Sequence, residues 1–176
     1  MKTKKVLFVV AHEGYQPVEY NDPKKIIEDA GFQVVTASNK PGTATATDGS
    51  TTSVDIMLDN VNVNDYDGII FIGGSGTLDS LDNETSYQLL QKAEKNYKVI
   101  GAICIATRIL AKAKIMNRKK ATGWNGDDAL ASIYEHYNVS YLPEINVVTD
   151  DMTITATDPK AAKDFGHEIV DLLERT

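Results

Sequence analysis

The sequence predicts an α/β fold: an open, mainly parallel β-sheet with helices on both faces. Its apolar residues gather in short continuous runs, such as Val6–Ala11, Ile69–Ile72 and Val99–Ile103, and such runs are typical of strands covered on both faces. Amphipathic segments of helical period alternate with these runs, as in open α/β sheets. A length of 176 residues corresponds to one domain, so we expect residues 1–176 to form a single domain.

The first part of the chain predicts a βαβ unit. After the first strand, Asp22 can cap a helix and Pro23 suits its first turn, so a helix is expected to begin there. Gly31 is a natural helix stop, and Gln33–Ser38 has the composition of a second strand. A strand, a helix and a strand in this order imply parallel pairing with a right-handed crossover.

The middle of the chain adds a hairpin, two strands and a helix. Thr43–Ser53 is rich in threonine and contains Asp48-Gly49, which predicts a small β-hairpin rather than a linker between domains. Ile69–Ile72 is the next buried strand. We expect a helix over Glu84–Lys95 and another strand over Val99–Ile103.

The last third supplies the remaining elements. Apolar residues at i, i+3, i+4 and i+7 predict one face of a helix after the strand that ends at Ile103; they are Ala106, Ile109, Leu110 and Ala113. A second hairpin is expected where Asn146–Thr149 and Met152–Thr155 flank two aspartates. Asp158-Pro159 then starts the final helix. The inner stripe of that helix consists of Phe165, Ile169, Leu172 and Leu173.

Composition and net charge disfavour some classes of binding partner. The chain has 18 lysine and arginine residues against 25 aspartate and glutamate residues, a formal net charge of −7. This balance disfavours nucleic acid and anionic membrane surfaces as partners. No segment approaches the roughly 18 apolar residues that a membrane helix needs. The apolar run after Met1–Lys5 is too short for the core of a secretion signal, and one cysteine cannot form an intrachain disulfide, so we expect a cytoplasmic protein.

Ligand-binding loops are expected at one edge of the sheet, because open parallel sheets bind ligands outside the carboxyl ends of their strands. Three loops lie at such ends: residues 12–20, 73–77 and 104–107. The glycine-rich turn Gly73–Gly76 can bring backbone N–H groups close to an anion, although an ordinary tight turn has the same composition. It lacks the lysine of a phosphate loop and the spacing of a dinucleotide fingerprint, so it carries no cofactor motif.

The one cysteine, Cys104, falls at a predicted turn from strand to helix. The small residues Ala102 and Ala106 stand two positions before and after it, as a nucleophile elbow requires. A thiol at a helix N-terminus has its pKa lowered, and the N–H of Ile105 would face an oxyanion formed above the sulfur. The alternative is an inert buried cysteine. Local features alone leave both interpretations open.

Several segments resemble the ThiJ/PfpI superfamily, which includes PfpI-type intracellular peptidases and protein deglycases. They are Val6–Ala11, Glu19 with Pro23, DYDGIIFIGG at 65–74, VIGAIC at 99–104 and RKKATGW at 118–124. The resemblance spans nearly the whole chain and implies a flavodoxin-like three-layer sandwich. It implies that Cys104 is the reactive cysteine and Glu19 the glutamate beside it. It also implies that Gly74 and Ile105 supply the two backbone N–H groups that bind an oxyanion.

The sequence departs from the family at both of its usual histidines. PfpI-like peptidases have a histidine directly after the cysteine, where this chain has Ile105, and deglycases keep one at a position that corresponds to Trp124. A Cys-His dyad is therefore in doubt. We expect His136 and His167 at the surface, whereas His12 either approaches the cysteine or lies in a solvated loop. His12 and Trp124 are thus candidate pocket residues.

Two carboxylate positions also have alternative interpretations. Glu19 is either a solvated carboxylate at a helix entry or, as the resemblance implies, a buried group whose pKa rises beside Cys104. In the second case a protonated Glu19 donates a hydrogen bond to the thiolate or relays a proton to substrate. Asp127-Asp128 is either a metal-binding pair or a solvated loop, and we expect the loop because no zinc spacing is present. We expect no metal and no other cofactor.

The resemblance implies glyoxalase- or deglycase-like chemistry on small carbonyl compounds or glycated groups, with Cys104 as nucleophile and Glu19 as proton carrier. Peptidase or amidase activity is disfavoured by Ile105. Whether the chain is an enzyme stays open, because a redox-sensing or chaperone-like stress protein would also use an oxidisable Cys104. A flavodoxin-like nucleotide or flavin binder is a further alternative. The resemblance also implies a homodimer or larger homo-oligomer.

Overall fold

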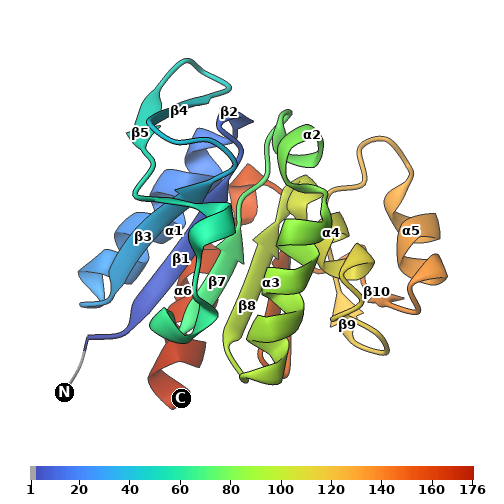
Figure 1. Ribbon diagram of the computed structural model, residues 1–176. Helices are drawn as coiled ribbons and strands as arrows, with labels where there is room; N and C mark the ends of the chain where they lie inside the picture. Colours follow the sequence, from blue (N-terminus) through green and yellow to red (C-terminus); the bar gives the residue numbers. More distant parts are fainter. Residues whose placement is uncertain (1–2) are drawn as a thin grey trace.

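The computed structural model describes residues 3–176, which form a three-layer α/β sandwich (Figure 1). The central sheet has seven strands: β1 (Lys5–Val10), β3 (Gln33–Ser38), β6 (Ile56–Met57), β7 (Gly68–Phe71), β8 (Val99–Ile103), β11 (Val147–Asp150) and β12 (Thr153–Ala156). They lie in the order β11-β12-β8-β7-β1-β3-β6. Every neighbouring pair is parallel except β11 and β12. The predicted fold class is confirmed.

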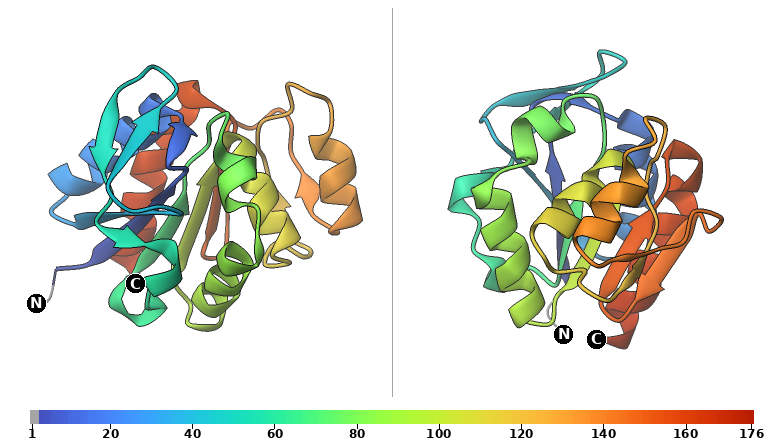
Figure 2. Two further views of the ribbon diagram at one scale, coloured as in Figure 1. Left: turned by 45° about the horizontal axis from the view of Figure 1, so that its top comes forward. Right: turned by 90° about the vertical axis from the view of Figure 1, so that its right-hand side faces the viewer.

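Helices cover both faces of this sheet. One face carries α1 (Pro17–Asp29) and α6 (Ala162–Arg175). The other carries α2 (Thr77–Leu81), α3 (Glu84–Lys95), α4 (Thr107–Lys112) and α5 (Leu130–His136). The right-hand view of Figure 2 shows α3 and α6 on opposite sides of the sheet. Among residues 3–176, no helix is both long enough and apolar enough to cross a membrane.

The side chains of β1 explain why its sequence is apolar throughout. Successive residues of a strand point to opposite faces of the sheet. Val6 and Phe8 therefore pack in the core under α1 and α6, whereas Leu7 and Val9 pack in the core under α3 and α4. All four are fully buried. A strand covered on both faces has no position at which a polar side chain reaches water.

Smaller elements extend the sandwich. A second sheet joins β2 (Glu13–Tyr15), β4 (Thr43–Ala46) and β5 (Thr51–Ser53), and a third pairs β9 (Lys120–Ala121) with β10 (Ser140–Tyr141). Short 3₁₀ helices are η1 (Leu58–Asn60), η2 (Val63–Asp65), η3 (Cys104–Ala106) and η4 (Pro159–Ala161). Both predicted hairpins are confirmed, because β4 and β5 pair antiparallel, as do β11 and β12.

The predicted start of the first helix is wrong. The helix begins at Pro17, because the Gln16 side chain caps it by accepting the N–H of Val18 at 2.6 Å. Pro23 consequently lies inside the helix rather than in its first turn. The helix continues past it and packs closely on α6, where a Cβ at Gly166 would lie 2.9 Å from the Cα of Pro23. The earlier start places Glu19 in the first turn of α1.

Other predicted elements agree with the structure. The helix Glu84–Lys95 and the strand Val99–Ile103 are found with the predicted bounds. Asp158 caps η4 by accepting the N–H of Lys160 at 2.8 Å. The predicted inner faces of α4 and α6 are buried throughout.

Candidate active site

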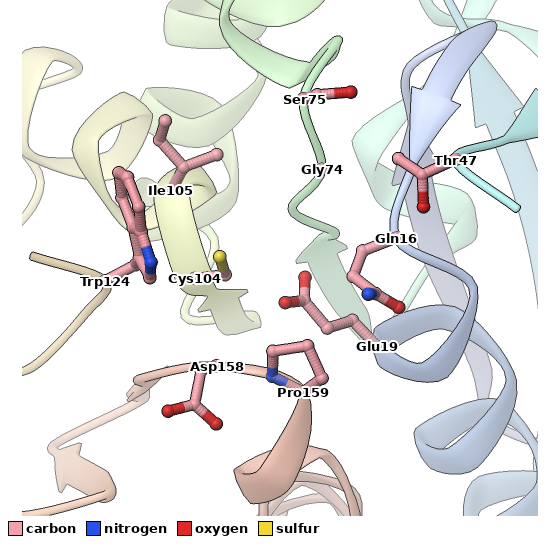
Figure 3. Close-up of a pocket in the computed structure, with 10 residues that line it drawn as sticks. All are labelled: Gln16, Glu19, Thr47, Gly74, Ser75, Cys104, Ile105, Trp124, Asp158 and Pro159. Atoms are coloured by element: carbon pink, nitrogen blue, oxygen red, sulfur yellow. The ribbon is translucent and has the colours of Figure 1, made fainter. Parts of the chain in front are cut away.

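A cavity of about 370 Å³ opens where the chain leaves the carboxyl ends of β7 and β8 (Figure 3). Its lining includes five residues that the sequence singled out: Glu19, Gly74, Cys104, Ile105 and Trp124. They come from the three loops expected at this edge of the sheet and from the segment after β9. The parallel order β8-β7-β1 brings those loops together, because neighbouring parallel strands end on the same edge.

Cys104 occupies a strained turn. It follows β8 directly, and its φ of 62° lies in the left-handed region, which costs a residue with a side chain about 1–3 kcal/mol. Its carbonyl accepts a hydrogen bond from Thr107 Oγ1 at 3.0 Å and from the N–H of Trp124 at 3.4 Å. The backbone N–H of Ile105 acts on the thiol by favouring its ionised form. The geometry is that of a nucleophile elbow, with the thiol facing the cavity.

Glu19 lies in the same cavity and is fully buried, which rules out the solvated interpretation of this residue. Its Oε2 accepts the N–H of Gly73 at 2.9 Å. Its Oε1 is buried, has no regular hydrogen-bond partner among residues 3–176, and belongs to a carboxyl group that interacts with the Cys104 thiol. Figure 3 shows the carboxyl group pointing from α1 toward the cysteine. The two groups therefore form a pair of a fully buried acid and a half-buried thiol.

Gly73 is required by this pair, and sequence reasoning saw it only as part of a glycine turn. A Cβ at Gly73 would lie 2.5 Å from Glu19 Oε2 and 2.7 Å from Cys104 Cβ, closer than atoms can approach. The absence of a side chain lets the carboxyl group and the cysteine meet. The carbonyl of Gly73 also accepts the N–H of Gln16 at 2.8 Å and so ties the start of α1 to this turn.

Burial dominates the protonation of both groups. It raises the pKa of Glu19 to about 7, although the Cys104 thiol and the hydrogen bond from the N–H of Gly73 act to lower it. Burial, followed by the charge of Glu19, raises the pKa of the Cys104 thiol well above its usual range, although the N–H of Ile105 opposes this. The expected lowering of the thiol pKa is therefore wrong. The helices that follow the cysteine are only three and six residues long, and their dipoles do not offset the desolvation.

Trp124 forms a wall of the cavity and is held by an arginine that sequence reasoning missed. The Arg108 guanidinium lies 5.6 Å from the centre of the indole ring and is only 5% exposed. It donates to both carboxylate oxygens of Asp127, at 2.6 and 3.0 Å, and these hydrogen bonds lower the pKa of Asp127 to about 2. The spacing of these residues carries no motif, so this contact could not be predicted from the sequence.

Asp127 and Asp128 are both exposed loop residues, as expected. Asp127 in addition forms an ion pair with Arg108. Within the described part of the chain, no group of three or more His, Cys, Asp or Glu side chains is placed to hold a metal ion.

The histidines lie away from the thiol. His12 does not line the cavity, and its Nε2 lies 3.0 Å from the carbonyl oxygen of Pro41. His136 and His167 are exposed, as expected. Of the two candidate pocket residues, the structure brings only Trp124 to the cysteine.

The cavity is also lined by five residues that the sequence analysis did not assign to the site: Gln16, Thr47, Ser75, Asp158 and Pro159. For Asp158 and Pro159 the sequence did contain a local structural signal, because the two residues were recognised as a helix start. Their position beside the cysteine depends on the pairing of β12 with β8, which brings the chain to this edge of the sheet.

Comparison with known proteins identifies the family of the chain. The sequence matches the DJ-1/PfpI family over residues 4–172. Protein MJ0967 of Methanocaldococcus jannaschii is 31% identical over 182 residues, covering 99% of this chain and 85% of that protein. Deglycase PH1704 of Pyrococcus horikoshii is 28% identical over 172 residues, covering 97% and 99%.

A solved structure shows the same fold. The crystal structure of a ThiJ/PfpI domain protein from Brachyspira murdochii aligns with a TM-score of 0.93 at 29% identity, covering 100% of this chain and 99% of that one. The resemblance found in the sequence is therefore confirmed, and the chain belongs to the DJ-1/PfpI family.

Proposed function

We propose that the protein is a cysteine-dependent enzyme that acts on small carbonyl compounds or glycated groups, with glyoxalase- or deglycase-like chemistry. The observation that carries this proposal is the pair of Cys104 and Glu19 in one cavity, with the cysteine on a strained turn and the carboxyl group fully buried. The name of the relative Deglycase PH1704 supports the same class of reaction.

The first step is addition of the thiol to an aldehyde. The Glu19 carboxylate takes the proton of the Cys104 thiol as the sulfur attacks the carbonyl carbon. A C–S bond forms, and the π electrons of the C=O bond move to oxygen. The N–H groups of Gly74 and Ile105 bind this oxyanion. Glu19 then returns the proton to oxygen, which gives a hemithioacetal.

For a 2-oxoaldehyde, the same carboxylate completes the reaction. Glu19 removes the proton from the carbon bonded to sulfur, which gives an enediolate, and delivers it to the neighbouring carbon. The hydroxyl proton of the sulfur-bearing carbon passes to the oxygen of that neighbour, which completes the conversion of the hemithioacetal into a 2-hydroxyacyl thioester. One water molecule then hydrolyses the thioester to a 2-hydroxy acid and the free thiol. The reaction as a whole consumes one water molecule and needs no external oxidant or reductant.

The pKa of Glu19 suits this task. A general acid–base group works best when its pKa lies near the working pH, and the pKa of Glu19 is about 7. Trp124 stands where deglycases keep a histidine, and an indole N–H donates a hydrogen bond but cannot accept a proton. The proton transfers are therefore assigned to Glu19 alone.

Methylglyoxal turnover tests the proposal. The wild type is compared with Cys104→Ser, Glu19→Gln and the control Glu174→Gln, an exposed residue near the end of α6. We expect both site variants to lose at least about 100-fold in kcat, since general acid–base catalysis contributes about 10²–10⁴-fold, and the control to match the wild type. An inactive wild type, or equal activity in all four proteins, would refute the mechanism.

We also propose that the chain assembles into a homodimer or larger homo-oligomer, on the strength of the family resemblance. Light scattering coupled to size exclusion measures the mass of the particle. A mass of 19.3 kDa at working concentrations corresponds to a monomer and would contradict this proposal.

A further inference from the structure

The cavity is lined by acidic and uncharged groups. Its titratable side chains are Glu19, Asp158 and Cys104, and none of the described residues that line it is a lysine, an arginine or a histidine. A substrate that carries a carboxylate or a phosphate therefore meets no positive side chain there. Pockets that bind such anions usually provide an arginine or a lysine.

The one arginine beside the cavity is already neutralised. Arg108 contacts the cavity wall through Trp124, but its guanidinium is bound by both oxygens of Asp127. Its charge is directed to that carboxylate and not to the space above the thiol.

Asp158, in contrast, has no cationic partner among residues 3–176. Its Oδ1 accepts only the backbone N–H of Lys160. The field of this carboxylate reaches the reactive pair, because it contributes to raising the pKa of both Glu19 and Cys104. Figure 3 shows Asp158 beside Pro159 on the chain segment below the cysteine, with its carboxyl group turned away from the thiol toward the start of η4, so it acts on the cavity through its charge rather than by direct contact.

We infer that the cavity selects neutral or positively charged carbonyl compounds and rejects anionic ones, with Asp158 as a residue that sets this specificity. The identification of the ligand as a carbonyl substrate rests on the proposed function. The charge selectivity itself does not, because any reagent that reaches the Cys104 sulfur must pass through the same field.

Alkylation of the cysteine measures this selectivity without turnover. Iodoacetamide and iodoacetate have nearly the same size and differ in charge, and Cys104 is the only cysteine of the chain. The rate with each reagent is followed by intact mass at pH 8. The ratio of the neutral to the anionic rate is then divided by the same ratio for free cysteine, which cancels the intrinsic reactivity of the reagents.

We expect this normalised ratio to be at least about tenfold for the wild type, because two carboxylates act on the anion in a partly desolvated space. Asp158→Asn should lower it at least about threefold, while the asparagine still caps η4. Asp171→Asn, an exposed position farther along α6, removes the same charge and should leave the ratio unchanged. A ratio near one in the wild type, or equal ratios in wild type and Asp158→Asn, would overturn the inference.

Turnover provides a second comparison. The preference for methylglyoxal over 4,5-dioxopentanoate, a 2-oxoaldehyde that carries a carboxylate, is measured as a ratio of kcat/KM values. It should fall in Asp158→Asn and stay constant in Asp171→Asn. If no protein turns over methylglyoxal, the proposed function fails, and the alkylation ratios still decide the charge selectivity. If methylglyoxal is turned over but neither the alkylation ratio nor the kcat/KM ratio changes in Asp158→Asn, the proposed function stands and the charge selectivity is refuted.

Discussion

Replacing Glu19 by glutamine should change how the stability of the protein depends on pH. Glu19 is fully buried, and burial raises its pKa from 4.5 to about 7. The folded state therefore holds a proton that the unfolded chain releases. A carboxyl group with a raised folded pKa contributes its full stabilisation below the unfolded pKa and loses it as pH rises through the folded pKa. The loss begins near pH 4.5 and is nearly complete above pH 7.

The magnitude follows from the pKa. One pKa unit corresponds to about 1.4 kcal/mol, so the free energy of unfolding should fall by about 3 kcal/mol across this range because of Glu19. Glutamine has nearly the same shape and does not ionise, so Glu19→Gln should lack this loss. The other titrating groups affect both proteins equally and cancel in the difference.

Urea unfolding of both proteins at pH 4.5, 6 and 8 measures this difference. We expect the variant to gain about 3 kcal/mol relative to the wild type between the lowest and highest pH. The range stops at pH 8 so that the cysteine of the unfolded chain hardly titrates. A difference that stays constant from pH 4.5 to 8 would show that the pKa of Glu19 is the same in the folded and the unfolded protein, which contradicts the pKa raised by burial.

Three further predictions concern the same cavity. Gly73→Ala should reduce activity at least about tenfold and destabilise the fold by roughly 1–3 kcal/mol, since its Cβ would collide with Glu19 Oε2 and Cys104 Cβ; wild-type activity would contradict the close approach. Arg108→Lys removes the planar guanidinium that binds two carboxylate oxygens, so Trp124 should become more accessible and its fluorescence, which comes from the only tryptophan, should be quenched more strongly by acrylamide. Unchanged quenching would show that the arginine does not hold the ring. Because the pKa of its thiol is raised, Cys104 should react with peroxide more slowly than free cysteine at pH 7; faster oxidation, seen by intact mass, would support the redox-sensing alternative instead.

Much of the fold could be predicted because its signals are local. A strand buried on both faces needs a run of apolar residues, and Val99–Ile103 was recognised with the bounds that the structure shows. The helix Glu84–Lys95 was also recognised with its observed bounds, and the structure shows that Asn83 caps it by accepting the N–H of Ser86. The start of α1 was missed because Asp22-Pro23 is an equally good local signal, whereas the real start at Pro17 is fixed partly by a backbone hydrogen bond to the distant Gly73.

The sequence alone determined the order of the elements, the parallel sheet and the position of Cys104 at a turn from strand to helix. These depend on residues a few positions apart. Only the tertiary structure decided what surrounds the thiol: a buried Glu19, an Asp158 with no cationic partner among residues 3–176, and no histidine among the described residues that line the cavity. It also showed that the pKa of the Cys104 thiol is raised and not lowered as expected. The physical reason is that desolvation and the field of neighbouring charges are set by residues that meet only when β1, β7, β8 and β12 are side by side in the sheet.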